Sequence, residues 1–256
     1  MTNSAVAPVA TDFANEVSQR LERLVALATE GGLDAAIGLM TRAVEVGAVI
    51  QAFGTGHSEA FAMEIAGRAG GLIPTNKIAL RDLVLHGSLA ADTLRGSSLE
   101  RNPDIVARLW EISPIHRGDV FVIASNSGVN GSVVGMALLA KERSHDVIAI
   151  TSLQHTAQVR PKHPSGLRLS EVADAVIDNL APYGDATLAL PGGVAVGSVS
   201  SITSAFIAQL LTIGVVERMR SNGRVPPLYL SANVPGGDKH NRALEKKYAR
   251  RIRRVT

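Results

Sequence analysis

Residues 120–132 read Val-Phe-Val-Ile-Ala-Ser-Asn-Ser-Gly-Val-Asn-Gly-Ser. The run begins with unbroken apolar residues, which is typical of a strand buried on both faces of a parallel sheet. The residues after it are mostly small, hydroxylated or glycine, and from 132 to 143 apolar residues return at helical spacing. The stretch therefore predicts a strand at 120–124, a polar loop and a helix at 132–143.

The same succession occurs on both sides of this stretch. Apolar residues 48–53 lead through Gly-Thr-Gly-His-Ser at 54–58 into a helical pattern at 58–69, and a strand at 147–150 precedes Thr151-Ser152. Further helices are predicted at 12–29, 33–46, 103–111 (with Asn102 as its cap), 199–221 and 238–251, and further strands at 175–177 and 187–190. Residues 72–74 and 78–83 are strand-like or irregular. Alternating strands and helices favour right-handed crossovers and a parallel sheet, which makes this an α/β protein.

Composition supports one globular unit and excludes several chemistries. The chain has 256 residues, 46% hydrophobic and 19% charged, which is ordinary for a folded protein. It has no cysteine, so disulfides, thiolate metal sites and cysteine nucleophiles are excluded. We expect a single domain over 1–256, with N-terminal helices at about 12–46, a core at about 48–221 and a C-terminal motif and helix at about 225–251.

Charge and hydropathy bear on partners and location. The net charge is +3, and much of the excess lies in the last dozen residues, so no general nucleic-acid-binding surface is expected. That basic tail is interpreted as a solvated helix end and frayed terminus, and the alternative is contact with an anion or a membrane. Residues 186–216 carry no charge, but glycine, proline and serine interrupt them, so they predict a strand, a loop and a buried helix. The expected location is the cytoplasm, without a membrane partner.

The loops that follow the strands are the candidate ligand site, because parallel sheets bind ligands outside the carboxyl ends of their strands. Hydroxyls, backbone N–H groups and helix N-termini together favour a phosphate. A dinucleotide fits less well, because Glu59 stands where its fingerprint needs a third glycine, and no Gly-Lys-Ser/Thr occurs for a P-loop. The alternative for 125–132 is an ordinary polar strand-to-helix turn. The residues predicted to bind the substrate or its phosphate are Gly56, His57, Ser58, Ser125, Asn126, Ser127, Gly128, Asn130 and Ser152.

These motifs resemble those of the SIS (sugar isomerase) domain family. Ser-Asn-Ser-Gly-x-Asn at 125–130 looks like its phosphosugar loop, and Gly-x-Gly-x-Ser at 54–58 looks like its first ligand loop. The pairing of Gly-Thr-Gly-His-Ser with Ser-Ala-Asn-Val-Pro-Gly-Gly-Asp-Lys-His-Asn at 231–241 is most similar to a bacterial branch of SIS proteins, over about 12–251. The resemblance implies a three-layer αβα sandwich around a five-stranded parallel sheet. It also implies a homodimer or homotetramer, an active site at a subunit boundary and a phosphorylated sugar as ligand.

Candidates for the chemistry follow from what an isomerisation through an enediol needs. A base must move a proton between adjacent carbons, and another group must handle the oxygens. Glu64 is predicted as the base, because it lies on the helix that begins at the first ligand loop and resembles a glutamate used by SIS enzymes. Its alternative role is an i,i+4 pair with Arg68. Glu59 is the reserve, although its charge would be awkward beside a phosphate.

Histidines supply the candidates for oxygen chemistry. His240, in the late motif, and His86 are predicted to open the sugar ring or shuttle a proton, although a structural role is common for a lone histidine. His57 is expected to shape the site, and Asp185 either binds sugar hydroxyls or is a turn residue. His116, His145, His155 and His163 are interpreted as surface or loop residues.

A reaction without metal or cofactor is expected. His57, Glu59 and Glu64 could supply metal ligands, but no close metal-binding spacing occurs. The leading hypothesis is a sugar-phosphate aldose–ketose isomerase. The alternatives are a phosphosugar-binding or regulatory module without catalysis and a sugar-phosphate lyase or etherase.

Overall fold

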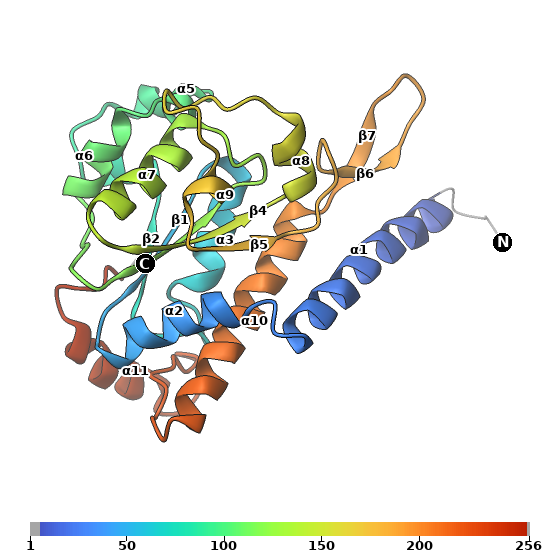
Figure 1. The fold of residues 1–256 in the computed structure, drawn as a ribbon. Coiled ribbons are helices and arrows are strands. Elements are labelled where there is room, and N and C mark those ends of the chain that lie inside the picture. The colour runs from blue at the N-terminus through green and yellow to red at the C-terminus, as the bar shows by residue number, and fades with distance from the viewer. Residues whose placement is uncertain (1–5, 255–256) are drawn as a thin grey trace.

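The computed structural model describes residues 6–254 and contains a five-stranded, wholly parallel sheet between layers of helices (Figure 1). The strand order is β2-β1-β3-β4-β5. This confirms the predicted αβα sandwich. The strands are β1 (Ile50–Gly54), β2 (Thr75–Ile78), β3 (Val120–Ala124), β4 (Asp146–Thr151) and β5 (Ala175–Asp178).

Helices cover both faces of the sheet, which explains the unbroken apolar runs: every residue of β1 and β3 is buried. One face packs against α1 (Val6–Thr29), α2 (Asp34–Glu45), α3 (Glu59–Ile65) and α10 (Ser200–Ser221). The other packs against α6 (Ile105–Glu111), α7 (Gly131–Glu142) and α9 (Leu169–Val172). Among the described helices, α10 is long and apolar enough to cross a membrane by length and composition, and α1 and α2 pass the same test only when the pair, bent by 68°, is counted as one span. Helix α10 packs against α2 and α3 and buries Ile207, Leu211 and Val215 in the core.

Several boundaries differ from the expectations. The edge strand β2 falls between the two stretches interpreted as strand-like or irregular. Helix α3 ends at Ile65, before Gly67 and Gly70, which adopt positive φ. Asn102 does accept a hydrogen bond from the Asp104 N–H at 2.9 Å, but α6 begins two residues later than the predicted cap requires.

Shorter elements lie outside the main sheet. The predicted strand at 187–190 is β6 (Ala186–Ala189), which pairs with β7 (Ala195–Ser198) in a separate antiparallel hairpin. This hairpin projects beside α1 in Figure 1. Further short helices lie between the strands: α4 (Asp82–Leu85), η2 (Ala91–Leu94), α5 (Ser98–Arg101) and α8 (Leu153–Gln158).

The expectation of a solvated, frayed basic tail is wrong for the part that the structure describes, up to Arg254. After α11 (Gly237–Glu245) and η3 (Lys246–Tyr248), the chain returns to the sheet, where Arg251 forms a 2.9 Å ion pair with the buried carboxylate of Asp119. Asn76 on β2 hydrogen-bonds the backbone of Arg251 and Arg253. A buried carboxylate needs charged and hydrogen-bonded partners, and the tail supplies one.

Candidate functional site

The loops after β1 and β3 meet at one cavity. In the strand order β2-β1-β3-β4-β5, β2 is added on one side of β1, and β3, β4 and β5 are added on the other. The gap between β1 and β3 is therefore the topological switch point, where parallel sheets bind ligands. A cavity of about 380 Å³ opens there. We call it the strand-end cavity. Its lining residues are Thr55, Gly56, His57, Ser58, Glu100, Ser125, Asn126, Ser127, His155, Asp185, Ser198, Ser200 and Ser201.

The first loop turns sharply because two glycines allow it. A side chain at Gly54 would collide with the Ser58 carbonyl, and Gly56 adopts a φ of +56°. A 3₁₀ turn, η1 (Gly56–Ser58), then leads into α3. No other described residue engages the Ser58 hydroxyl, so this group is free to donate to a ligand in the cavity.

The serine loop after β3 is also held by a glycine. Gly128 has a φ of +64°, and a Cβ there would lie 2.9 Å from the Thr151 hydroxyl oxygen. The Gly128 N–H donates to Ser125 Oγ at 3.1 Å, which leaves the Ser125 hydroxyl proton available. Ser127 lines the cavity, and its hydroxyl has no partner among residues 6–254.

Glu100 is a cavity residue that the sequence analysis missed. It lies on the short helix α5, and its carboxylate accepts a hydrogen bond from Asn130 Nδ2. Its backbone carbonyl accepts another from Ser132 Oγ at 2.7 Å. The start of α7 therefore positions this carboxylate across from the ligand loops. Glu100 has no apolar periodicity or known motif around it, so no local signal pointed to it.

His155 also lines the cavity, although the sequence suggested a surface or loop residue. Its ring stacks on Tyr183 with the ring centroids 5.2 Å apart, and its Nδ1 is 3.0 Å from the Gly184 N–H. Burial lowers the pKa of His155, an effect that Asp185 opposes and Lys162 reinforces. An Nδ1 that accepts a hydrogen bond assigns the proton of the neutral ring to Nε2.

Asp185 is a helix cap that borders the cavity. Its Oδ1 accepts the Ser200 N–H at 2.8 Å and its Oδ2 accepts the Ser200 hydroxyl at 2.7 Å, at the start of α10. Asp185 itself adopts a φ of +72°. The turn role and the cavity position considered from the sequence therefore coexist in one residue.

Three predicted binding residues support the cavity without lining it. Gly128 donates to Ser125, and Asn130 holds Glu100. Ser152 is fully buried; its hydroxyl donates to the Ala181 carbonyl at 2.6 Å and accepts the His155 N–H at 2.9 Å. The other six predicted binding residues line the cavity: Gly56, His57, Ser58, Ser125, Asn126 and Ser127.

The structure places the predicted catalytic residues outside the cavity lining of this chain. Glu64 binds Arg68, its i+4 neighbour, and accepts a 2.6 Å hydrogen bond from Gln209 on α10. His86 is exposed at the end of α4. His240 is exposed on α11, with its Nε2 3.0 Å from the Leu228 carbonyl oxygen.

Glu59, the reserve base, has its carboxylate engaged in two ion pairs. Its carboxylate binds Lys77 at 3.2 Å and Arg81 at 2.8 Å. These two cations compensate the negative charge that directly follows Ser58. Within residues 6–254, no group of three or more His, Asp or Glu side chains is arranged to hold a metal ion.

Comparison with solved structures supports the fold. The chain aligns with a phosphoheptose isomerase from Francisella tularensis (TM-score 0.54, 16% identity, 83% of this chain and 99% of that one). It also aligns with a phosphoheptose isomerase from Neisseria gonorrhoeae (TM-score 0.51, 19% identity, 84% and 99%). A third match is E. coli CFT073 c3406, solved in complex with A5P (TM-score 0.52, 15% identity, 86% and 94%).

Sequence comparison identifies the family. Residues 12–152 match the family model of the SIS domain. A UPF0309 protein of Geobacillus kaustophilus is 36% identical over 241 residues, 94% of each chain. Another from Caldanaerobacter subterraneus is 32% identical over 246 residues, 95% of this chain and 98% of that one. With its two ligand loops meeting at the switch point of a parallel sheet, the chain belongs to the SIS domain family.

Proposed function

We propose that the strand-end cavity binds a phosphorylated sugar and that the protein interconverts its aldose and ketose forms through an enediol. The observation that carries the proposal is the meeting of two serine loops with a carboxylate, Glu100, and a neutral histidine, His155, in one cavity. The volume of about 380 Å³ suits a small organic ligand. Structural neighbours named as phosphoheptose isomerases give further support.

The phosphate is held by directional hydrogen bonds. Ser58, Ser125 and Ser127 supply hydroxyl donors, and the loop backbones add N–H groups. None of the described lining residues is lysine or arginine. Charge-assisted hydrogen bonds from several neutral donors bind a single phosphate without attracting larger polyanions.

Proton transfer between C1 and C2 needs a carboxylate beside the open-chain sugar. Glu100 takes the carbon-bound proton and returns it to the neighbouring carbon, so no proton is gained or lost overall. The His155 Nε2–H gives its proton to the C1 carbonyl oxygen as the enediol forms, and Nε2 takes back the proton of the C2 hydroxyl as the ketose forms, so the oxygen protons balance as well. Asn130, through its hydrogen bond to Glu100, positions the base.

Glu64 remains the base predicted from the sequence, with His86 and His240 as the predicted groups for oxygen chemistry. In this chain they lie outside the cavity lining. In the predicted homodimer or homotetramer, Glu64, His86 and His240 would reach the strand-end cavity of a neighbouring subunit. A cytoplasmic location also remains a prediction.

A thermal-shift screen of sugar phosphates, each beside its unphosphorylated parent sugar, tests the binding step. A bound ligand raises the melting temperature by mass action. We expect shifts that require the phosphate and that Ser125→Ala/Ser127→Ala removes, whereas Ser165→Ala, at an exposed loop remote from the cavity lining, keeps them. Equal shifts with parent sugars would contradict the proposal.

Turnover of the ligands found in that screen tests the chemistry. Glu100→Gln should bind the sugar phosphate but lose activity by about 100-fold or more, the usual contribution of a general base. Glu64→Gln should retain activity; the reverse pattern would make Glu64 the base. Binding without conversion in the wild type would identify a binding module, and an unsaturated product or a released acid would identify a lyase.

A further inference from the structure

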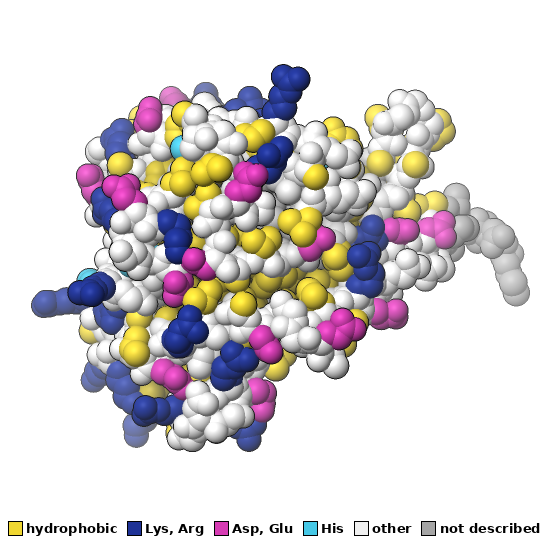
Figure 2. Space-filling view, viewed as in Figure 1, with side chains coloured by type: hydrophobic (Ala, Val, Ile, Leu, Met, Phe, Trp, Pro, Cys, Tyr) yellow, Lys and Arg dark blue, Asp and Glu magenta, His cyan; other side chains and the backbone are white. Residues whose placement is uncertain are grey.

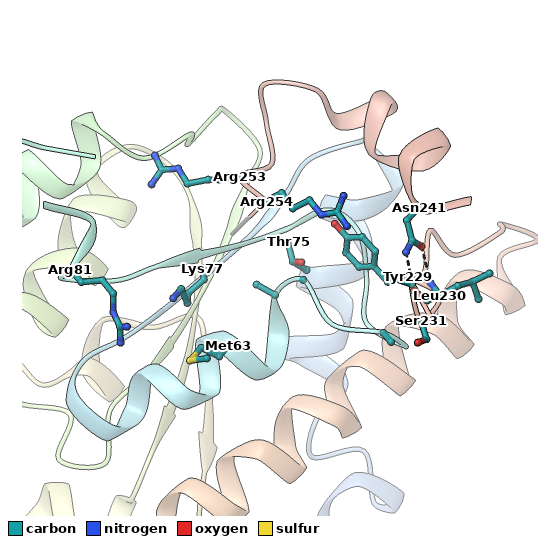
Figure 3. Close-up of a pocket in the computed structure, with 14 residues that line it drawn as sticks. Met63, Thr75, Lys77, Arg81, Tyr229, Leu230, Ser231, Asn241, Arg253 and Arg254 are labelled. Atoms are coloured by element: carbon teal, nitrogen blue, oxygen red, sulfur yellow. Dashed lines mark hydrogen bonds between the residues drawn. The ribbon is translucent and has the colours of Figure 1, made fainter. Parts of the chain in front are cut away.

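A second, larger cavity lies beside the edge strand β2. Its volume is about 640 Å³, and it opens between α3, β2 and the chain around α11 (Figure 3). We call it the basic cavity. Lys77, Arg81, Arg253 and Arg254 line it, and no described Asp or Glu does. Figure 2 shows Lys and Arg side chains gathered on the surface over α11. The sugar-phosphate proposal uses none of these groups.

The late sequence motif at 231–241 builds one wall of this cavity. Asn241 clamps Leu230 by accepting its N–H at 2.9 Å and donating to its carbonyl at 2.8 Å. Gly237 passes so close to the Ser231 carbonyl that a side chain would not fit. The clamp and the close approach hold Leu230 and Ser231 against the cavity (Figure 3). The motif therefore has a local structural task at the basic cavity, away from the strand-end cavity.

The cations of the cavity are positioned by carboxylates that do not line it. Lys77 and Arg81 share Glu59. Arg253 lies 3.6 Å from Asp82, and Arg254 lies 3.5 Å from Glu245. Four cations thus stand against three carboxylates. Ammonium and guanidinium groups have several donors each, so these pairs leave N–H groups for an anion in the cavity.

The lining also includes apolar surface. Met63 contributes it near Lys77, and Leu230 contributes it at the other end (Figure 3); Tyr229 donates its hydroxyl to Glu245 at 3.1 Å. Burial, reinforced by Glu245, raises the pKa of Tyr229 to about 12, so its hydroxyl stays neutral. In Figure 3, Lys77, Arg81 and Arg253 lie toward one end, and Leu230, Ser231 and Asn241 toward the other. A ligand that matches this lining carries an anionic group and an organic body.

We propose that the basic cavity is a second ligand site, which binds an organic molecule bearing a diphosphate or longer phosphate chain. Four cations spread over a cavity of this size match more than one phosphate, and the apolar surface between them accommodates the remainder of the ligand. The site stands on the Lys and Arg lining and is independent of the sugar-phosphate proposal.

Isothermal titration calorimetry with inorganic pyrophosphate, the part that all such ligands share, tests the proposal. Citrate serves as a comparison anion without phosphate. Pyrophosphate should bind the wild-type protein, and Arg81→Gln/Arg254→Gln should weaken it by about tenfold or more, because charged hydrogen bonds are lost. Both arginines are half exposed, so their replacement leaves the core intact. The matched control Arg95→Gln/Arg220→Gln removes two exposed arginines outside the cavity and should bind like the wild type.

Three outcomes would overturn the proposal. The first is the absence of pyrophosphate binding at about 1 mM, the weak limit of useful affinity. The second is citrate binding as tight as pyrophosphate binding. The third is pyrophosphate binding that survives the arginine variant but is lost in Ser125→Ala/Ser127→Ala, since the anion would then occupy the strand-end cavity. Loss of sugar-phosphate binding in the serine variant, with pyrophosphate binding retained, separates the two sites.

Discussion

His155 is held in an environment that favours its neutral form. Burial lowers its pKa below the ordinary 6.5, so between the folded and unfolded pKa values the unfolded chain binds more protons. Stability should therefore fall as the pH drops from about 7.5 through 6.5 and further toward the folded pKa. Urea denaturation at pH 7.5 and 5.5 measures this loss.

The variant His155→Gln isolates the contribution of this residue. It removes the titrating ring, so the difference in unfolding free energy between the two pH values should shrink. It should not vanish, because burial also lowers the pKa of His163. His86→Gln, at an exposed position, is the control and should keep the wild-type pH dependence. An unchanged pH dependence in His155→Gln would contradict this account.

At the scale of elements, the described C-terminal tail packs against the sheet and contributes to its stability. Asp119 is almost fully buried and accepts hydrogen bonds from the Val49 N–H and Gln51 Nε2 in addition to its ion pair with Arg251. Arg251→Gln should lower the free energy of unfolding by about 1–3 kcal/mol, because a buried carboxylate loses its charged partner. Lys247→Gln, on the exposed face of η3, should change it by less than about 0.5 kcal/mol. Chemical denaturation of both variants provides the measurement, and equal losses would refute a specific role for Arg251.

The strands that the sequence predicted well are those whose burial shows in their own sequence as a continuous apolar run. Residues 120–124 were predicted with the bounds of β3, because an apolar run between turn residues is a local signal. The edge strand β2 was missed since Asn76 and Lys77 are polar. Their partners come from far along the chain: Asn76 binds the tail and Lys77 binds Glu59. Contacts between residues so far apart in the chain produce no hydrophobic periodicity within the strand itself.

At the scale of the whole molecule, the loops that line the strand-end cavity were predictable and their surroundings were not. Serine- and glycine-rich loops after strands point to a cavity because parallel strands end at one edge. Glu100 and His155 reach that cavity from two short helices, α5 and α8, and neither position carries a local signature. The basic tail likewise gained its partners only through tertiary contacts.

Glu59 physically links the two cavities. It follows Ser58 of the strand-end cavity, and its carboxylate is neutralised by Lys77 and Arg81 of the basic cavity. An anion that binds Lys77 and Arg81 weakens their pairing with Glu59. The negative charge of Glu59 then repels the sugar phosphate more strongly. Saturating pyrophosphate should therefore weaken sugar-phosphate binding about 5-fold, and sugar phosphate should weaken pyrophosphate binding by the same factor, as linkage requires.

Calorimetric titration of each ligand with and without the other measures this coupling. In Glu59→Gln the carboxylate charge is absent, so the two ligands should bind independently of one another. Glu142→Gln, on the far side of the sheet at the end of α7, is the control and should keep the coupling of the wild type. Coupling that persists in Glu59→Gln would exclude this residue as the link. Complete mutual exclusion would mean that both ligands compete for one cavity, whereas a finite and reciprocal factor requires two sites joined through the start of α3.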